Sequence, residues 1–406
     1  MFLDALMSRN PRLMSAAAEL ALSGEIPANT VVLDLDAIRS NGQAIRAAAE
    51  KHGLSLYWML KQVGRNPLVA KALVAPGSAE TVSVDVACAD ALLHNDFRLG
   101  HVGNLVQIAR ADLPRLMRTR PEAMSVFSAD KARQVGEVAR RLGVVQPVLL
   151  RVADTATDTY LPGMEAGFLL DELASAAKTI QTIDGVQIIG VTTFPTVSYA
   201  TPGQPTPTGN FTTIQRAAAI LEGLGIEVTQ VNAPGNTSSI TVPMQAAGGA
   251  THIEPGHGFL GTTPYHLQYD DLPEIPAACY VTEVAHHFGG RAYVYGGGFF
   301  VDDPAWLQPD FGRKALVGST LDEILEHRET YLGAGAGTSG SFGGIDYYGF
   351  LDADEQTAPV GATVVFGFRV QTFVTRANIA VIDHENGSPR VLGIFDQLGR
   401  RLPWYA

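Results

Sequence analysis

The sequence predicts a (β/α)8 barrel followed by an all-β domain. From Ser55 to Ile253, eight short apolar runs alternate with amphipathic helical stretches. After Gly261 the pattern changes to short strands of alternating polarity, separated by glycine-rich turns. Parallel strands joined by right-handed helical crossovers close most economically into a barrel, whereas alternating strands are typical of an antiparallel sheet. A doubly wound open sheet is the alternative for the first part of the chain.

The predicted elements follow one another in a regular order. Helical spacing over residues 10–22 predicts a lead-in helix, and the run Thr30–Leu35 predicts a strand that joins the later β-domain. The barrel strands are expected at residues 55–60, 81–84, 101–105, 124–127, 148–152, 186–191, 227–231 and 251–253. Helices between them are expected at 87–95, 129–142, 170–180 and 211–221. The later strands are expected at 280–285, 292–295, 363–366, 370–374, 379–382 and 391–395.

Length and composition support more than one folded region. We expect an N-terminal helix and strand over 1–35, a barrel over 36–262 and a β-domain over 263–406. With 406 residues, of which 46% are hydrophobic and 17% charged, the chain can fill large cores. The net charge of −12 argues against nucleic acid and anionic membranes as partners. Two cysteines without metal-like spacing, and apolar runs shorter than the about 20 residues of a membrane span, predict a cytoplasmic protein.

Lys61 ends the apolar run Leu56–Leu60, the first predicted barrel strand. A lysine at the mouth of an apolar pocket loses hydration, which lowers the pKa of its amine and lets it attack a carbonyl to form a Schiff base. A lysine that extends from a strand end into water is the structural alternative. The strand end therefore makes Lys61 a candidate nucleophile.

Polar residues and glycine-bearing turns follow other barrel strands. In a (β/α)8 barrel the chemistry lies at the C-terminal ends of the strands. Those positions hold Arg151 and Thr193, and also the turns Asn232–Thr237 and Glu254–His257. Backbone N–H groups beside the glycines of such turns can hold a phosphate. Together with Lys61, the set combines an amine, an acid placed to meet a basic nitrogen, and two turns suited to phosphate.

The motifs resemble those of the alanine racemases and related fold-type III pyridoxal phosphate (PLP) enzymes, in the same order. Tyr57–Lys61 looks like the strand that carries their cofactor lysine, and Gly235–Thr237 resembles their Ala-Asn-Ser phosphate segment. His252–Gly256 resembles their Arg-Pro-Gly motif, in the Glu-Pro-Gly form of the ornithine and diaminopimelate decarboxylase branch. Ala292–Gly297 resembles the segment that supplies their second catalytic base, a tyrosine. The resemblance covers the chain from about residue 30 onward.

The resemblance implies pyridoxal 5′-phosphate as the cofactor. Lys61 would carry it as an aldimine, and Lys61 and Tyr295 would work as bases from opposite faces of the substrate Cα. Thr193 stands where the racemases have a histidine that stacks on the cofactor ring. The implied phosphate ligands are Gly235, Asn236, Thr237, Gly256 and His257.

Glu254 stands where alanine racemases place an arginine against the pyridine nitrogen. A carboxylate there favours the protonated ring, a strong electron sink that suits decarboxylation or β-elimination as well as racemisation. An acidic cap before a turn is the structural alternative. The arginine of the racemases' Gly-Met-x-Arg-Leu-Gly segment is absent, which leaves Arg151, Arg65 or Arg376 to bind the substrate carboxylate.

The leading functional prediction is a PLP-dependent racemase that acts on an amino acid and works as a homodimer. A PLP-dependent decarboxylase or Cβ lyase of the aldolase kind is one alternative, and a PLP-binding protein without turnover is another. No metal is expected, because Arg376 and Asn378 stand where D-threonine aldolase relatives carry a His-x-Cys metal pair.

Overall fold

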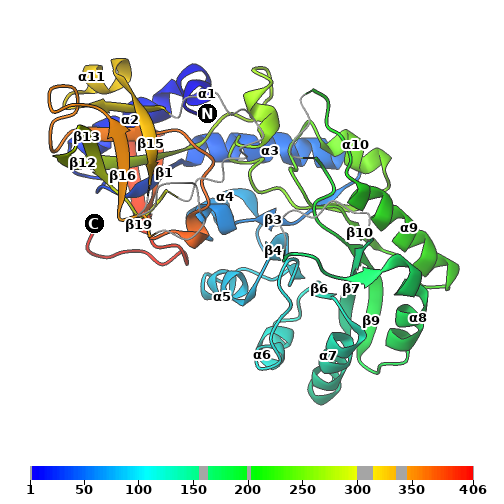
Figure 1. Ribbon diagram of the computed structural model, residues 1–406. Coiled ribbons are helices and arrows are strands. Elements are labelled where there is room, and N and C mark those ends of the chain that lie inside the picture. Colours follow the sequence, from blue (N-terminus) through cyan, green and yellow to red (C-terminus); the bar gives the residue numbers. More distant parts are fainter. Residues whose placement is uncertain (1, 155–162, 199–202, 300–313, 335–344, 406) are drawn as a thin grey trace. The chain divides into compact units, whose positions relative to one another are not determined.

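The computed structural model forms two compact units, each built from separate stretches of the chain (Figure 1). The β-unit comprises Met1–Gly42, Lys61–Ala72 and Phe259–Ala406, and the barrel unit comprises Gln43–Leu60 and Leu73–Gly258. The residues that the structure describes are 2–154, 163–198, 203–299, 314–334 and 345–405. None of the described helices is long and apolar enough to cross a membrane.

A parallel sheet closes on itself in the barrel unit. Its strands run in the order β2-β11-β10-β9-β7-β6-β5-β4-β3, with β8 paired to β7. Their bounds are β2 Ser55–Leu56, β3 Trp58–Met59, β4 Thr81–Ser83, β5 His101–Val102, β6 Ala123–Val126, β7 Gln146–Ala153, β8 Phe168–Leu169, β9 Val186–Thr192, β10 Gln230–Asn232 and β11 His252–Ile253. Leu56 pairs with Ile253, and Met59 pairs with Val82, so the two ends of the sheet meet at Tyr57. This closure confirms the predicted barrel and excludes the open sheet.

Helices cover the outside of the barrel strands, with α5 to α9 following one another in Figure 1. The helices of the barrel unit are α5 Val86–His94, α6 Leu113–Arg118, α7 Ala129–Leu142, α8 Leu170–Gln181, α9 Gly209–Gly223 and α10 Val242–Ala247, whereas α3 Leu35–Lys51 and α4 Pro67–Leu73 begin in the β-unit. Side-chain caps fix some of their starts: Asp85 accepts a hydrogen bond from the Cys88 N–H at 2.7 Å, and Ser128 accepts one from the Lys131 N–H at 3.2 Å. Each cap turns the chain from a strand end into the next helix.

The β-unit contains a mainly antiparallel sheet of nine strands among the described residues. The order is β13-β16-β15-β14-β17-β12-β1-β18-β19, and β12 also pairs with β13, so six of these strands form a closed ring. The bounds are β1 Thr30–Asp34, β12 Ala278–Phe288, β13 Arg291–Tyr295, β14 Lys314–Gly318, β15 Arg328–Ala334, β16 Tyr348–Asp352, β17 Thr363–Phe366, β18 Asn378–Glu385 and β19 Ser388–Phe395. The remaining elements are α1 Phe2–Arg9, α2 Pro11–Leu22, α11 Leu321–Glu326, η1 Lys61–Val63, η2 Pro264–Leu267 and η3 Thr372–Val374.

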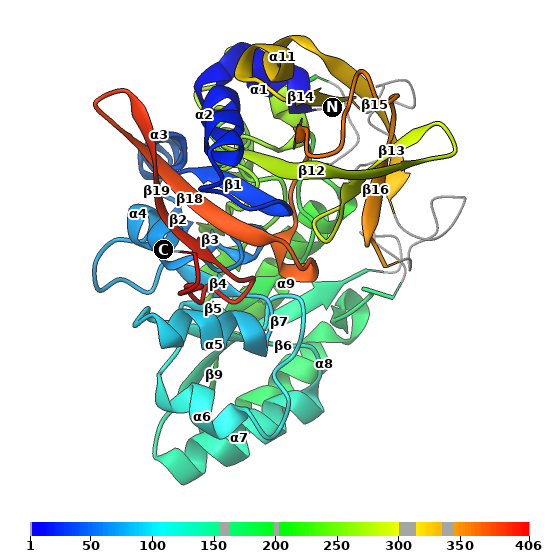
Figure 2. The same ribbon diagram turned by 90° about the vertical axis from the view of Figure 1, so that its left-hand side faces the viewer.

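β1 connects the start of the chain to the C-terminal strands. It pairs antiparallel with β12 and parallel with β18, and Figure 2 shows β1 in blue beside β18 in orange. The predicted membership of Thr30–Leu35 in the β-sheet is therefore correct for its strand residues. The prediction of a strand at 370–374 is wrong, because Thr372–Val374 forms a 3-10 turn. The Thr372 hydroxyl donates to the Gln62 carbonyl at 2.8 Å, a tertiary contact that fixes this turn.

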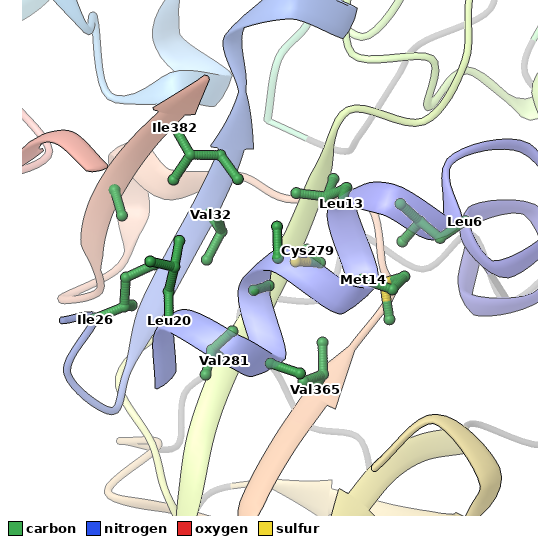
Figure 3. Close-up of a cluster of buried hydrophobic side chains, with 14 of the residues drawn as sticks. Leu6, Leu13, Met14, Leu20, Ile26, Val32, Cys279, Val281, Val365 and Ile382 are labelled. Carbon is green, nitrogen blue, oxygen red and sulfur yellow. The ribbon is translucent and has the colours of Figure 1, made fainter. Parts of the chain in front are cut away.

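The core of the β-unit lies between α2 and the sheet (Figure 3). Leu13 and Met14 on α2 belong to one buried cluster with Val32, Val281 and Val365 of the strands. All five of these side chains are at most 1% exposed. The apolar face of α2 therefore holds the N-terminal segment on the sheet.

Replacing Leu13 by alanine is expected to lower the free energy of unfolding by about 2–5 kcal/mol, because it removes buried methyl groups and leaves a cavity. Urea unfolding followed by far-UV circular dichroism measures the change. Val360→Ala is the control, since Val360 is 65% exposed and its truncation should cost less than about 0.5 kcal/mol. Equal losses in the two variants would contradict the assignment of Leu13 to the core.

Candidate functional site

Glu254 follows β11 and is the centre of a buried polar network in the barrel unit. Its side chain is 1% exposed. One carboxylate oxygen lies 2.7 Å from His101 Nδ1 and accepts a hydrogen bond from Asn232 Nδ2 at 2.7 Å. The other oxygen accepts a hydrogen bond from the Asn104 amide. A buried carboxylate with three such partners is stabilised in its charged form by donors rather than by water.

The network continues from its two partner side chains on β5 and β10. His101 Nε2 lies 2.7 Å from the Ser125 hydroxyl on β6, and Asn232 also donates to the Thr192 hydroxyl on β9 at 3.2 Å. His101, Ser125, Thr192 and Asn232 are all buried. The network thus joins side chains of β5, β6, β9 and β10 to Glu254, which follows β11.

Arg151 lies on β7 and reaches the same network. Its guanidinium donates to the Asn104 carbonyl at 3.0 Å and lies 5.6 Å from the centre of the Phe127 ring. Burial lowers the pKa of Arg151 to about 10, while the nearby Glu254 charge opposes that shift. Arg151 Nε has no hydrogen-bond partner among the described residues. A buried cation with an unused donor is suited to binding an anionic group.

The predicted phosphate turns lie close together in the barrel unit. Gly235 has φ +132°, and a Cβ atom there would lie 3.0 Å from Thr196 N, so this turn admits only glycine without rearrangement. A Cβ atom on Gly258 would lie 2.1 Å from the Thr237 carbonyl oxygen, which shows how closely the segment after Gly256 and His257 approaches the Gly235–Thr237 turn. The neighbouring Ser238 hydroxyl is buried and has no hydrogen-bond partner within the described ranges.

The other residues predicted to bind the cofactor near these turns are Asn236, Thr237, Thr193 and His257. Asn236 has φ +47° and donates to the Ser198 carbonyl at 2.9 Å, while Thr237 accepts from Gln245 at 3.3 Å. The Thr193 hydroxyl donates to the Val152 carbonyl at 3.0 Å. His257 is 5% exposed. The hydrogen bonds of Thr193, Asn236 and Thr237 hold the loops after β9 and β10 in place.

Lys61 begins η1, two residues after the end of β3, and belongs to the β-unit. Its Nζ lies 5.0 Å from the centre of the Phe373 ring, and the Arg65 guanidinium lies 5.6 Å from the same ring. Thr372 donates to the Gln62 carbonyl beside it. The turn around Phe373 therefore positions Lys61 within its own unit.

Tyr295 is the last residue of β13 in the β-unit and is 43% exposed. Its ring lies 6.4 Å from that of Tyr348, and its carbonyl accepts a hydrogen bond from the Thr282 hydroxyl at 2.6 Å. The backbone of Tyr295 is thus anchored, while its side chain is accessible.

The structure brings some of the predicted residues together and adds others. Arg151 and Glu254 meet through Asn104, whereas Lys61 and Tyr295 both fall in the β-unit. The sequence analysis did not select His101, Asn104 or Ser125. A histidine inside a predicted barrel strand was the one available signal, since barrel interiors are usually filled by branched apolar residues.

A group of three potential metal ligands lies away from these residues, in the β-unit. It consists of Asp34, Asp36 and His384, whose ligand atoms lie within 4.8 Å of one another. The Asp34 carboxylate accepts hydrogen bonds from the first turn of α3 and from Asn10, and the Asp36 carboxylate pairs with Arg39 at 3.1 Å. Asp34 is therefore explained as a cap of α3, and Asp36 as the partner of Arg39 in an ion pair.

A second polar layer surrounds Tyr57. The His252 ring stacks on Tyr57 with centroids 5.2 Å apart, and Gln230 donates to the Tyr57 hydroxyl at 3.0 Å. Burial, with a smaller repulsion from His101, lowers the pKa of His252 to about 4. Burial also raises the pKa of Tyr57. Both groups are neutral near pH 7.

His252 is therefore expected to make the protein less stable in mild acid. In the unfolded chain its imidazole takes up a proton near pH 6.5, while in the fold it does so only near pH 4. The stabilisation is present above pH 6.5 and is lost as the pH falls toward 4, by about 2 kcal/mol between pH 7 and 5. Urea unfolding at both pH values should show a smaller pH effect in His252→Gln. His94→Gln, at an exposed position, is the control, and an unchanged pH effect in His252→Gln would contradict the prediction.

Two protein families account for most of the chain. Residues 33–264 match the family described as "Alanine racemase, N-terminal domain". The chain belongs to this alanine racemase-like family. Residues 279–391 match "YhfX-like, C-terminal domain". The "Uncharacterized protein YhfX" of Escherichia coli strain K12 is 36% identical over 404 residues, which cover 99% of this chain and 100% of that protein.

Solved structures of alanine racemase-like proteins share the fold. The D-threo-3-hydroxyaspartate dehydratase from Delftia sp. HT23 is similar at a TM-score of 0.65 with 18% identity, over 90% of this chain and 96% of that one. The D-threonine aldolase from Filomicrobium marinum has a TM-score of 0.61 with 16% identity, over 92% and 95%. An alanine racemase of Clostridium difficile 630 has a TM-score of 0.62 with 15% identity, over 92% and 99%. At these identities the similarity shows the fold.

The alanine racemase-like family binds PLP, and the described residues of this chain fit that cofactor. The barrel unit offers a buried carboxylate, Glu254, that can accept a hydrogen bond from a protonated ring nitrogen. It also offers a glycine turn beside the buried Ser238 hydroxyl, whose hydrogen-bonding capacity no described residue uses. An aromatic ring nitrogen and a phosphate are the two polar ends of PLP, and these two groups can accommodate them.

Proposed function

We propose that this protein is a PLP-dependent enzyme that acts at Cα of an amino acid, and that racemisation is its reaction. The observation that carries the proposal is the buried Glu254 carboxylate, held by His101, Asn104 and Asn232 in a barrel of this family. When bound, PLP withdraws electrons from Cα and stabilises the negative charge left when a proton departs. A fixed carboxylate beside the ring nitrogen strengthens that effect.

Each residue has a defined task in this proposal. Lys61 would hold the cofactor and take up the α-proton at one face of Cα, and Tyr295 would supply a proton at the other face. Glu254 would keep the ring nitrogen protonated by accepting its hydrogen bond. The phosphate would be held by the two turns, through Gly235, Asn236, Thr237, Gly256 and His257. Thr193 would line the cofactor without stacking on it, because its hydroxyl is engaged with the Val152 carbonyl.

Arg151 is the proposed ligand of the substrate carboxylate. It is 4% exposed, uses one guanidinium nitrogen on the Asn104 carbonyl, and has an unused Nε among the described residues. A carboxylate can accept two parallel hydrogen bonds from a guanidinium, which fixes the orientation of Cα as well as binding the substrate. Arg376 is less suited, because it pairs with Asp346 at 2.9 Å and its side chain is 53% exposed.

We further propose that the enzyme is a homodimer in which Tyr295 of one subunit completes the site of the other. The 43% exposure of Tyr295 at the end of an anchored strand supports this role. Mixing inactive Lys61→Ala and Tyr295→Phe subunits should restore activity through mixed dimers. A cytoplasmic location is also proposed, since Cys88 and Cys279 are buried free thiols.

Cleavage of a bond to Cβ is the second candidate. The carboxylate of Glu254 would support elimination or aldol cleavage as well as racemisation, because each reaction leaves negative charge on Cα. Structural neighbours named as a D-threonine aldolase and a D-threo-3-hydroxyaspartate dehydratase share the fold. Loss of carbon dioxide, the decarboxylase outcome, is the third reaction to test.

One experiment tests these proposals in sequence. The purified protein is incubated with PLP, its absorbance is recorded before and after borohydride, and the labelled peptide is identified by mass spectrometry. We expect a long-wavelength band that borohydride removes, with the label on Lys61. Amino acids are then screened for change of optical configuration, aldehyde, ammonia and carbon dioxide. A protein that takes up no PLP would overturn the proposal, and a product other than the opposite enantiomer would replace racemisation by the reaction observed.

A further inference from the structure

Glu254 cannot act on a ring nitrogen unless something fixes its orientation and its charge, and His101 is placed to do both. His101 is fully buried and its Nδ1 lies 2.7 Å from a Glu254 oxygen. This contact joins residues 153 positions apart, inside one compact unit. The contact therefore forms only when the strands that carry the two residues have come together in the barrel.

The partners of the two ring nitrogens indicate which one carries the proton: an ionised Glu254 oxygen beside Nδ1 can only accept, whereas the Ser125 hydroxyl beside Nε2 can donate or accept. The Ser125 Oγ lies 2.7 Å from His101 Nε2, and a hydroxyl can donate to an unprotonated ring nitrogen. The proton of a neutral imidazole then stands on Nδ1, from which it is donated to Glu254. Asn232 Nδ2 lies 3.2 Å from His101 Nδ1 and 2.7 Å from the same Glu254 oxygen, so the two N–H groups converge on that oxygen.

We propose that His101 is a positioning residue that acts through Glu254: its Nδ1–H holds the carboxylate in one rotamer and in its charged form, and Ser125 maintains the required tautomer. This inference rests on the proposed role of Glu254 toward PLP. His101 itself does not contact the reacting atoms. Its effect is to make the carboxylate a reliable acceptor for a protonated ring nitrogen.

The first test needs no cofactor. Long-range proton–nitrogen NMR of the histidine-labelled protein reports which ring nitrogen of His101 carries a proton, with the signal assigned from His101→Gln. We expect a proton on Nδ1 in the wild type, and loss of the single tautomer in Ser125→Ala. An unprotonated Nδ1 in the wild type would overturn the proposal, because His101 would then accept from Asn232 instead of donating to Glu254.

The second test measures the effect on the cofactor. We expect His101→Gln to weaken PLP binding about tenfold, the loss of one charge-assisted hydrogen bond, and to shift the absorbance band of the bound cofactor. The label on Lys61 should remain. His252→Gln is the matched control, since His252 is a second barrel histidine, on β11, and stacks on Tyr57.

The outcomes separate this inference from the proposed function. If the wild type takes up PLP on Lys61 and His101→Gln has the same affinity and spectrum, the role of His101 is wrong and the proposed function stands. If the wild type takes up no PLP, the proposed function fails, while the tautomer measurement still shows whether His101 donates to Glu254. Ser125→Ala removes a single oxygen and provides the spectral test should His101→Gln not fold.

Discussion

The Lys61→Ala protein is expected to take up no covalent label and to lose amino-acid turnover by at least about 10²–10⁴-fold. The loss follows because alanine has no amine to hold the cofactor and no base to exchange a proton at Cα. Initial rates of turnover and the mass of the borohydride-treated protein measure the two effects. Stability should change little, because the Lys61 side chain is only half-buried at the start of the short turn η1 and does not belong to the buried core.

Lys71→Ala is the control for this change. Lys71 lies in α4, only ten residues further on, and is exposed. Its replacement should leave labelling and turnover at the wild-type level. Wild-type turnover in Lys61→Ala would contradict the prediction and show that Lys61 has no part in catalysis.

The Glu254→Ala protein is expected to lose about 3 kcal/mol or more of its free energy of unfolding. The substitution leaves donors on His101, Asn104 and Asn232 buried without an acceptor, and it removes the negative charge that compensates Arg151. Each buried donor left without an acceptor lowers the free energy of unfolding by about 1–3 kcal/mol, and a buried cation without its negative partner lowers it further. Urea unfolding at pH 7 measures the difference.

Glu122→Ala provides the comparison within the same barrel. Glu122 is exposed, and its contact with the Tyr57 hydroxyl is 3.4 Å long, so its loss should cost less than about 1 kcal/mol. A loss in Glu254→Ala no larger than in Glu122→Ala would show that the buried network does not stabilise the barrel.

The barrel could be predicted from the sequence because most of its strands are short runs that are largely buried on both faces, such as β4, β6 and β10. Such runs contrast with the amphipathic helices that follow them, and the alternation defines the topology. The strands of the β-unit were predicted less completely than those of the barrel. The strands at Lys314–Gly318, Arg328–Ala334 and Tyr348–Asp352 were missed, and the pairing of β15 with β16 shifts register between Tyr331 and Gly333. Such an irregularity interrupts the alternation that identifies a strand.

The candidate site was predicted in part, for a related reason. The residue types and their places at strand ends were visible at Arg151 and Glu254, because barrel chemistry gathers at one end of the strands. The network around Glu254 was not visible, since its hydrogen bonds to His101 and Asn104 span 153 and 150 residues. Hydrogen bonds between residues so far apart in the sequence form because the barrel closes, and they produce no periodic pattern of residue types that could be recognised in the sequence.

The position of β1 has a consequence for synthesis of the protein on the ribosome. Thr30 pairs with Asn378, about 350 residues later, and at 5–20 residues per second the partner strand is made roughly 20–70 s after β1. Until β12 and then β18 have been made, the apolar face of α2 and the two edges of β1 are not fully covered. A nascent or truncated chain without β18 would therefore expose an edge strand beside an apolar helix, and chaperone binding or aggregation should begin at this segment.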